Sequence, residues 1–218
     1  MGGQVTRRGG RPTLDDAKRK SEQLLEAATA LFVERGFEGT TMEAVALAAG
    51  IGKQAVYQRY PNKEAMFTAI VARLSDEGEA AMPRHDNRDS LADGFARRIL
   101  DYLRYALSPR SQLVCRLVMR EGHRFPPLVL LLEQTTLERM IQPLAIFLEM
   151  AILRGEARKA DMMAVASACV DLVFAEAMRS AFQQRTLSPT QLRRVASGIV
   201  DIVLPGLERP ADKQGTVA

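Results

Sequence analysis

The segment from Ile51 to Lys63 carries the side chains best suited to binding a ligand. It holds three basic residues and no acidic residue, although the whole chain of 218 residues is nearly balanced, at 30 Lys and Arg against 26 Asp and Glu. Basic side chains neutralise phosphates, and amides such as those of Gln54 and Gln58 bond to base edges in a duplex. This local charge pattern favours double-stranded DNA as the partner.

Enzymatic chemistry is the alternative that the sequence disfavours. We find no G-x-S-x-G motif, no Gly-rich phosphate loop and no Cys/His cluster with metal-ligand spacing. Cys115 and Cys169 lie far apart, and His85 and His123 are the only histidines. We therefore predict no catalytic residue, no metal site and no cofactor.

Two short helices must position the basic segment. Thr40 followed by Glu43 is a capping-box pattern that starts one helix, and Gly50 ends it. A second short helix covers about 53–60, and Pro61 ends it because proline cannot continue a helix. Two short helices joined by a tight turn predict a helix-turn-helix.

The other segments are also helical in period. Gly36 ends a first helix and Asn62 caps a fourth, while Ser108, Asp161 and Ser188 start later ones. A long helix over about 127–153 should be kinked at its internal proline, Pro143. No alternating strand pattern occurs, so we predict an all-α fold of roughly nine helices.

The chain is expected to divide into a head and a body. A basic arm covers 1–12, a three-helix DNA-binding head 13–62, a regulatory and dimerisation body of about six helices 63–208, and a tail 209–218. The start of the chain has no apolar signal region, and the longest apolar run is far shorter than the ~20 residues that span a bilayer. We expect a cytoplasmic protein without a membrane partner.

The run from Gly36 to Ala46, followed by Ala49 to Glu64, resembles the tetracycline-repressor (TetR/AcrR) family of bacterial regulators. The resemblance covers about 13–75 as ordered matches; beyond that it is architectural. It implies a helix-turn-helix head, a ligand-binding body and a homodimer on a palindromic operator. It also implies repression of transcription until a small-molecule effector enters the body. A regulator without an effector, either an activator or one controlled by a protein partner, is the alternative.

The resemblance also implies which residues contact DNA. The positions that match family contacts are Thr41, Gly52, Lys53, Gln54, Tyr57, Gln58, Arg59 and Lys63, with Arg11 before the first helix as a minor-groove candidate. Tyr60 matches an aromatic that is largely packed in the family, so it ranks lower as a contact. Two positions depart from the family. Gly52 stands where many members have Ser or Thr as a helix cap, and Gln54 stands where many have Gly. A glutamine there adds a group that bonds adenine, so base preference is expected to depend on it.

Residues of the body are less determined by sequence. Candidates for an effector pocket, each of which could equally be core packing, are Phe95, Tyr102, Met119, His123, Phe125, Phe147, Met150, Phe174 and Met178. The last two helices carry broad aliphatic stripes, which we expect to form the dimer interface through Val165, Cys169, Val173, Val195, Ile199, Val200 and Val203.

Overall fold

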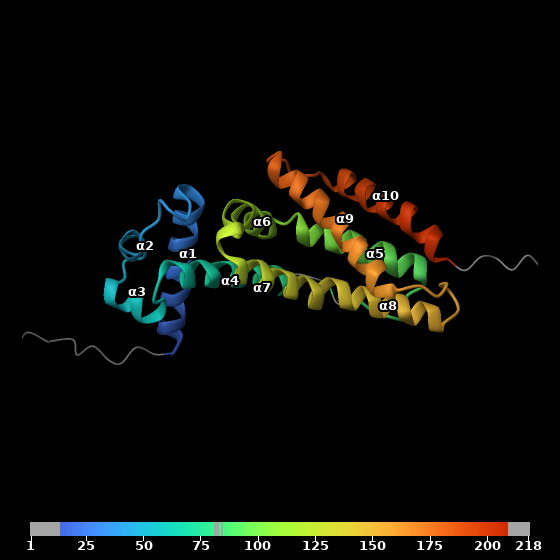
Figure 1. The fold of residues 1–218 in the computed structure, drawn as a ribbon, viewed down its shortest axis with the longest axis horizontal. Coiled ribbons are helices and arrows are strands. Elements are labelled where there is room, and N and C mark those ends of the chain that lie inside the picture. Colours follow the sequence, from blue (N-terminus) through green and yellow to red (C-terminus); the bar gives the residue numbers. More distant parts are fainter. Residues whose placement is uncertain (1–13, 81–82, 84, 209–218) are drawn as a thin grey trace, which may run out of the picture. The chain divides into compact units, whose positions relative to one another are not determined.

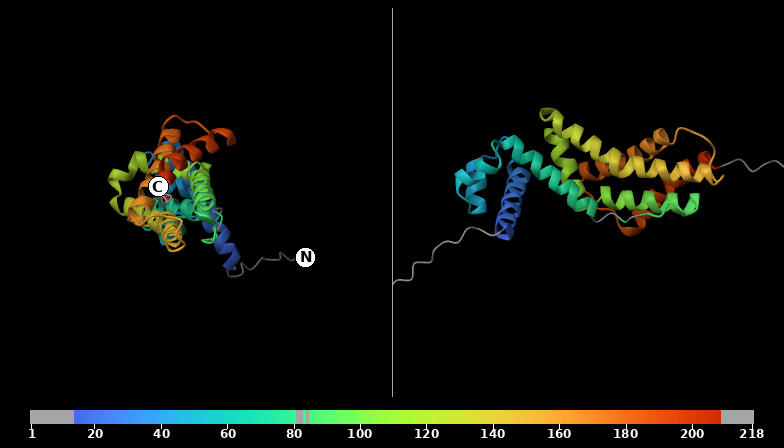
Figure 2. Two further views of the ribbon diagram at one scale, coloured as in Figure 1. Left: turned by 90° about the vertical axis from the view of Figure 1, so that its right-hand side faces the viewer. Right: turned by 90° about the horizontal axis from the view of Figure 1, so that it is seen from below.

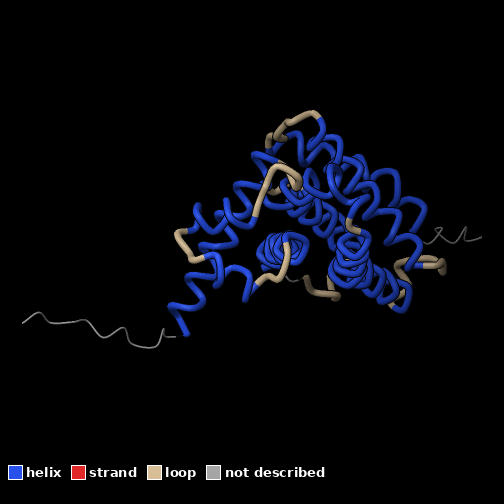
Figure 3. The backbone as a smooth tube through the Cα atoms, turned by 60° about the vertical axis from the view of Figure 1, so that its left-hand side comes forward, coloured by secondary structure: helices blue, strands red, loops and turns tan. Residues whose placement is uncertain are grey.

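The computed structural model describes residues 14–80, 83 and 85–208, and its regular elements are helices (Figures 1 and 3). They are α1 Leu14–Arg35, α2 Met42–Ala49, α3 Lys53–Arg59, α4 Lys63–Ala80, α5 Leu91–Ala106, α6 Pro109–Glu121, α7 Pro126–Thr136, α8 Gln142–Leu153, α9 Met162–Phe182 and α10 Pro189–Leu207. Within these described residues the only extended pairing is an isolated bridge between Ala157 and Glu208. The predicted all-α class is confirmed.

The described chain forms two compact units, one ending at Ala72 and the other beginning at Arg73. The first holds α1 to α3 and the start of α4, around three aromatic rings. Phe32 stacks on Phe37 with ring centroids 5.8 Å apart, and Phe67 meets both edge-on at 5.3 and 5.6 Å. Val45 of α2 and Val56 of α3 are fully buried in the same unit, so both short helices are anchored by apolar side chains.

The start of α2 corrects one sequence prediction. The cap is Thr41, whose hydroxyl accepts from the Ala44 backbone N–H at 3.1 Å, and not Thr40. The Thr40 side chain is buried and donates toward the backbone carbonyls of Leu31 and Gly36. Thr40 therefore holds the loop against the end of α1, and because its hydroxyl is used there it does not cap α2.

The other predicted helix boundaries agree with the structure. Asn62 accepts from the Ala65 N–H, and Ser108, Asp161 and Ser188 each accept from the N–H three residues on. Gly36 and Gly50 have φ of 76° and 64°, the left-handed conformation that glycine adopts without steric cost.

The predicted long helix over about 127–153 is interrupted at its centre. A π-helical turn, Leu137–Ile141, joins α7 to α8, and Figure 2 shows the two as a nearly continuous rod. Pro143 lies in the first turn of α8, where its missing N–H leaves an α-helical bond unmade. If α7 and α8 are counted as one interrupted helix, the described residues contain nine α-helices, besides a 3-10 turn at Gly122–Arg124.

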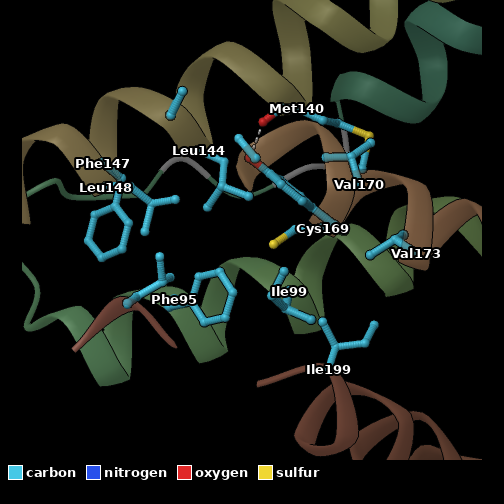
Figure 4. Close-up of a cluster of buried hydrophobic side chains, with 14 of the residues drawn as sticks. Phe95, Ile99, Met140, Leu144, Phe147, Leu148, Cys169, Val170, Val173 and Ile199 are labelled. Carbon is cyan, nitrogen blue, oxygen red and sulfur yellow. Dashed lines mark hydrogen bonds between the residues drawn. The ribbon is translucent and has the colours of Figure 1, made fainter. Parts of the chain in front are cut away.

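The core of the second unit lies between α5, α8, α9 and α10 (Figure 4). Phe95 and Ile99 of α5 meet Leu144 and Phe147 of α8 there, and each of these side chains is fully buried. The hydroxyl of Tyr102 donates to the Met140 carbonyl at 3.0 Å, so one polar atom enters the core with a partner.

A buried arginine secures the segment that precedes α5. Arg98 is 1% exposed, and its guanidinium lies 3.8 Å from the centroid of the Phe147 ring. It donates to the carbonyls of Gly94 and Asp86 and to the side chain of Asn87. These bonds compensate for the desolvation of the charge and fix the loop against the helix.

Candidate nucleic-acid interface

Helix α3 leaves almost its whole surface open to a ligand. Val56 is its one buried side chain, and Lys53, Gln54, Gln58 and Arg59 are exposed. A helix in a packed core would bury a full stripe of apolar side chains. The polar surface of α3 is therefore available for phosphates and base edges, as a recognition helix requires.

An acidic residue of α2 occupies part of this surface. The Lys53 ammonium lies 2.5 Å from the Glu43 carboxylate, and the Tyr57 hydroxyl is 3.5 Å from the same oxygen. The hydrogen bond from Lys53 lowers the pKa of Glu43, and the carboxylate in turn raises the pKa of Lys53. Sequence analysis missed this pairing, because it predicted Glu43 as part of a helix cap.

Lys63 has a structural partner as well. Its ammonium donates to the Phe37 carbonyl at 2.8 Å and lies 4.2 Å from the centroid of the Phe37 ring. The residue is partly exposed, and an ammonium has three donors. Two donors remain for a phosphate, but loss of the side chain would also loosen the loop after α1.

The remaining predicted contacts lie on or beside the two short helices. Thr41 is exposed at the start of α2, and Gly52 precedes α3 without a side-chain cap, as expected from the absence of a hydroxyl. Tyr60 follows α3 and is partly buried, in keeping with its lower rank as a contact. Arg11 lies outside the described residues.

The second unit contains an apolar cavity of about 410 Å³. Its walls come from α4, α5, α6, α7 and α9, and consist of Leu74, Ser75, Tyr105, Ser111, Val114, Cys115, Val118, Met119, Leu132, Thr135, Thr136, Phe174 and Met178. The volume falls within the range of about 300–1,000 Å³ that is usual for small-molecule pockets. Burial raises the pKa of the Cys115 thiol, which lies 3.8 Å from the Met119 sulfur.

The structure separates the predicted effector residues into three groups. Met119, Phe174 and Met178 line this cavity. Phe95, Tyr102 and Phe147 are instead buried in the core, with 0 to 1% exposure, and do not line it. His123, Phe125 and Met150 lie outside its walls too, so nothing in the geometry of these six residues brings them to the cavity.

Two family models match the chain. "Bacterial regulatory proteins, tetR family" matches residues 24–70, and "AefR-like transcriptional repressor, C-terminal domain" matches residues 94–205, which is more than half of the chain. The chain belongs to the TetR family. The chain is thus a helix-turn-helix DNA-binding transcriptional regulator, and the family is one of regulators rather than enzymes.

Named relatives match the chain over part of their length. YhgD of Bacillus subtilis is 37% identical over 76 residues, 31% of this chain, and the activator FasR of Mycolicibacterium smegmatis is 33% identical over 90 residues, 39% of this chain. The repressor KstR2 of Rhodococcus jostii is 38% identical over 69 residues, 30% of this chain. The matches span 40% of YhgD and of FasR and 34% of KstR2.

Solved structures share the fold over almost the whole chain. The flavonoid-responsive regulator FrrA has a TM-score of 0.75 at 26% identity, and the match covers 89% of the present chain and 100% of the FrrA chain. A TetR-family regulator from Mesorhizobium loti has a TM-score of 0.73 at 24% identity, with 88% and 98% covered.

The predicted dimer residues lie mainly on the inward side of α9 and α10. Cys169 and Val173 are 1% and 0% exposed within a single chain, and Ile199 is 7% exposed. Val165, Val195, Val200 and Val203 are partly buried against the same core. The aliphatic stripes thus pack first against their own chain, and a second copy is not needed to bury Cys169 or Val173.

The sequence did not predict most of the residues that line the cavity. Ser111, Cys115 and Val118 recur at helical spacing on α6, a signal that could have marked a second apolar face beside the core face. Among the described residues there is no group of three or more His, Cys, Asp or Glu side chains that could hold a metal ion. No described helix is long and apolar enough to cross a membrane.

Proposed function

We propose that the protein is a homodimeric repressor that binds a palindromic operator and is released by a small-molecule effector, in the cytoplasm where the operator lies. The observation that carries the DNA-binding part is α3, which anchors itself through Val56 alone and exposes its polar side chains. The similarity to an AefR-like repressor domain supports repression. The activator FasR is also a relative, so the direction of control needs its own measurement.

The exposed side chains of α3 divide into two roles. Gln54 and Gln58 offer amides for base edges, and Lys53 and Arg59 offer cations for phosphates. Thr41, just before α2, and Lys63, at the start of α4, add contacts to the phosphates of the DNA backbone before and after α3 in the sequence. Loss of Gln54 should relax base preference, whereas loss of Arg59 should weaken binding to all sequences.

The effector part of the proposal depends on the apolar cavity. Leu74 and Ser75, from the same helix that begins at Lys63, form part of its wall. A ligand that displaces this stretch of α4 would act on a helix that belongs to both compact units. FrrA, which shares the fold, is named as flavonoid-responsive, and this supports a small-molecule response in the present chain.

The dimer part depends on the outward faces of α9 and α10. Leu172 and Ile202 are 42% and 76% exposed, and a methyl group added at Gly198 would meet no atom within 4 Å. A second copy packed over these faces would bury them in a four-helix bundle. Two recognition helices spaced about 35 Å apart would then meet successive major grooves of a palindrome.

The test is to sequence the genomic fragments that the purified full-length protein retains. We expect one inverted repeat to be enriched, and Gln54→Ala to broaden the sequence at one position in each half. Enrichment of unrelated fragments in proportion to their length would contradict operator binding. Sedimentation of Ile202→Asp, which leaves the protomer core untouched, tests the dimer; an unchanged sedimentation coefficient at micromolar concentration would place the interface elsewhere.

Ligand release is tested by linkage. An effector that weakens DNA binding must itself bind less tightly to the DNA complex, by the same factor. A ligand whose affinity is the same with and without the retained operator is not an inducer. If this holds for every small molecule that binds the cavity, the alternative regulator without an effector is correct.

A further inference from the structure

The walls of the cavity exclude a charged group from its interior. All thirteen lining side chains are uncharged, and most are aliphatic, aromatic or sulfur-containing. An ionised group placed among them would lose its water without gaining a counter-charge, which is strongly unfavourable. The part of a ligand that fills this space is therefore apolar, with a few hydroxyl neighbours such as Ser111 and Thr135.

One edge of the cavity opens to solvent. Met119 of α6 and Met178 of α9 both line it, yet they are 44% and 46% exposed. Met119 also lines a second hollow of about 260 Å³, together with Arg116, Arg120, Ala181 and Phe182. The two hollows therefore adjoin at Met119.

Helical spacing explains why the second hollow differs in character. Arg116 precedes Met119 by three residues on α6, and Phe182 follows Met178 by four on α9, so each is one turn from a cavity residue. Phe182 is 81% exposed, which is unusual for so large an apolar side chain unless a ligand or partner covers it. The hollow thus combines an exposed aromatic ring with guanidinium groups.

Arg116 has a charge without an acidic partner. Within the described part of the chain it makes no hydrogen bond or ion pair, and its charge lowers the pKa of the neighbouring Cys115 thiol against the larger, opposite effect of burial. Arg120, in contrast, is paired with Glu121 at 3.1 Å. An anion in the second hollow would therefore find its strongest attraction at Arg116.

We propose that the paired hollows bind an amphipathic anion, with an apolar body in the cavity and a carboxylate or similar group at Arg116. The inference rests on the proposed function, since it gives the ligand class of the proposed effector cavity. The cavity volume corresponds to about fourteen water-sized groups, which suits a chain of roughly ten carbons or a compact ring system.

The probes are decanoate and decan-1-ol, which differ only in the head group. Calorimetric titration of the full-length protein should show that decanoate binds about tenfold more tightly than decan-1-ol. This preference lies between the contribution expected from an exposed ion pair and that expected from a hydrogen bond to a charged group. In Arg116→Gln the preference should fall below about threefold, while the affinity for decan-1-ol stays unchanged. Arg110→Gln, on the same helix but outside both hollows, is the matched control and should keep the preference.

A second variant tests the apolar half. Val118→Phe places a ring in the cavity and should weaken both probes alike, whereas Arg116→Gln weakens decanoate alone. Equal binding of the two probes to the wild-type protein would overturn the proposal. An unchanged decanoate affinity in Arg116→Gln would also overturn the proposal. That test does not depend on whether Val118→Phe folds.

Operator binding separates this inference from the proposed function. If decanoate binds through Arg116 but saturating decanoate leaves operator affinity unchanged, the ligand class holds and the release mechanism fails. If decan-1-ol binds as tightly as decanoate and also releases the operator, the release mechanism holds and the ligand class is wrong.

Discussion

Glu43→Gln is expected to steepen the salt dependence of DNA binding. In the free protein the Glu43 carboxylate neutralises Lys53 at 2.5 Å. When Lys53 turns to a phosphate, one DNA counterion is released, but the abandoned carboxylate takes up a cation from solution. The two exchanges nearly cancel. With glutamine at position 43 only the release remains, so the slope of log K against log salt should become more negative by up to about 0.9.

This slope predicts a measurable difference in affinity. Between 50 and 200 mM salt, a slope change of about 0.9 is a factor of roughly 3.5 in the binding constant. The variant should therefore bind more tightly than the wild type at low salt and lose most of that advantage as salt rises. Both partners are largely exposed, so we expect little change in thermal stability.

The assay is fluorescence anisotropy of a labelled operator duplex over a salt series. Adding Lys53→Gln to Glu43→Gln should return the slope to that of the wild type, since the released contact is then lost. Glu149→Gln, an exposed glutamate in the second unit, controls for net charge. An identical slope in the wild type and Glu43→Gln would refute the assignment of Lys53 to a phosphate. An equal change of slope in Glu149→Gln would show that the effect comes from net charge and not from the pair of Glu43 and Lys53.

Three further predictions concern stability. In Gly94→Ala the new methyl group would lie 2.5 Å from Cζ of Phe147, so urea unfolding should show a loss of about 1–3 kcal/mol. An unfolding free energy equal to or above that of the wild type would contradict the packing argument. Burial and Arg98 lower the pKa of His85 below its usual 6.5 despite the nearby Asp101 carboxylate. The unfolded chain then binds this proton more tightly than the folded protein does, so the contribution of His85 to folding stability is complete above pH 6.5 and is lost as the pH falls through its folded pKa. Urea midpoints measured from pH 7.5 to 5 should therefore fall less in His85→Gln than in the wild type. Parallel curves would show that His85 does not cause the loss of stability. Lys63→Met should lower the free energy of unfolding in urea by about 1–2 kcal/mol, because the bond from Lys63 to Phe37 is lost. It should also reduce the slope of log K for DNA binding against log salt by about 0.9. A loss of stability with an unchanged slope would show that Lys63 has a structural role only.

Local patterns determined the helices and most of their ends. A serine or aspartate that accepts from the N–H three residues on needs no distant partner, so Ser108, Asp161 and Ser188 were predictable as caps. The helix-turn-helix was likewise predictable, because its glycines, caps and apolar spacing all lie within about twenty residues. The structure then shows that α3 buries Val56 and exposes the polar side chains that the sequence predicts as DNA contacts.

Partners distant in sequence were decided only by the tertiary structure. The sequence favours Thr40 as the cap, because Glu43 follows it three residues on, but Thr40 bonds the carbonyl of Leu31 on another helix and Thr41 becomes the cap. The same is true of Lys63, whose bond to Phe37 spans 26 residues and gives a predicted phosphate contact a second role in the fold.

The apolar residues of the body show this limit most clearly. Phe147 and Phe174 are alike in sequence, each on an apolar helix face, yet the first fills the core and the second lines a cavity. Whether an apolar face closes or leaves a space depends on how helices from five parts of the chain cross one another. The sequence by itself determined which faces are apolar, and only the packing of α4, α5, α6, α7 and α9 decided where a ligand-sized space remains.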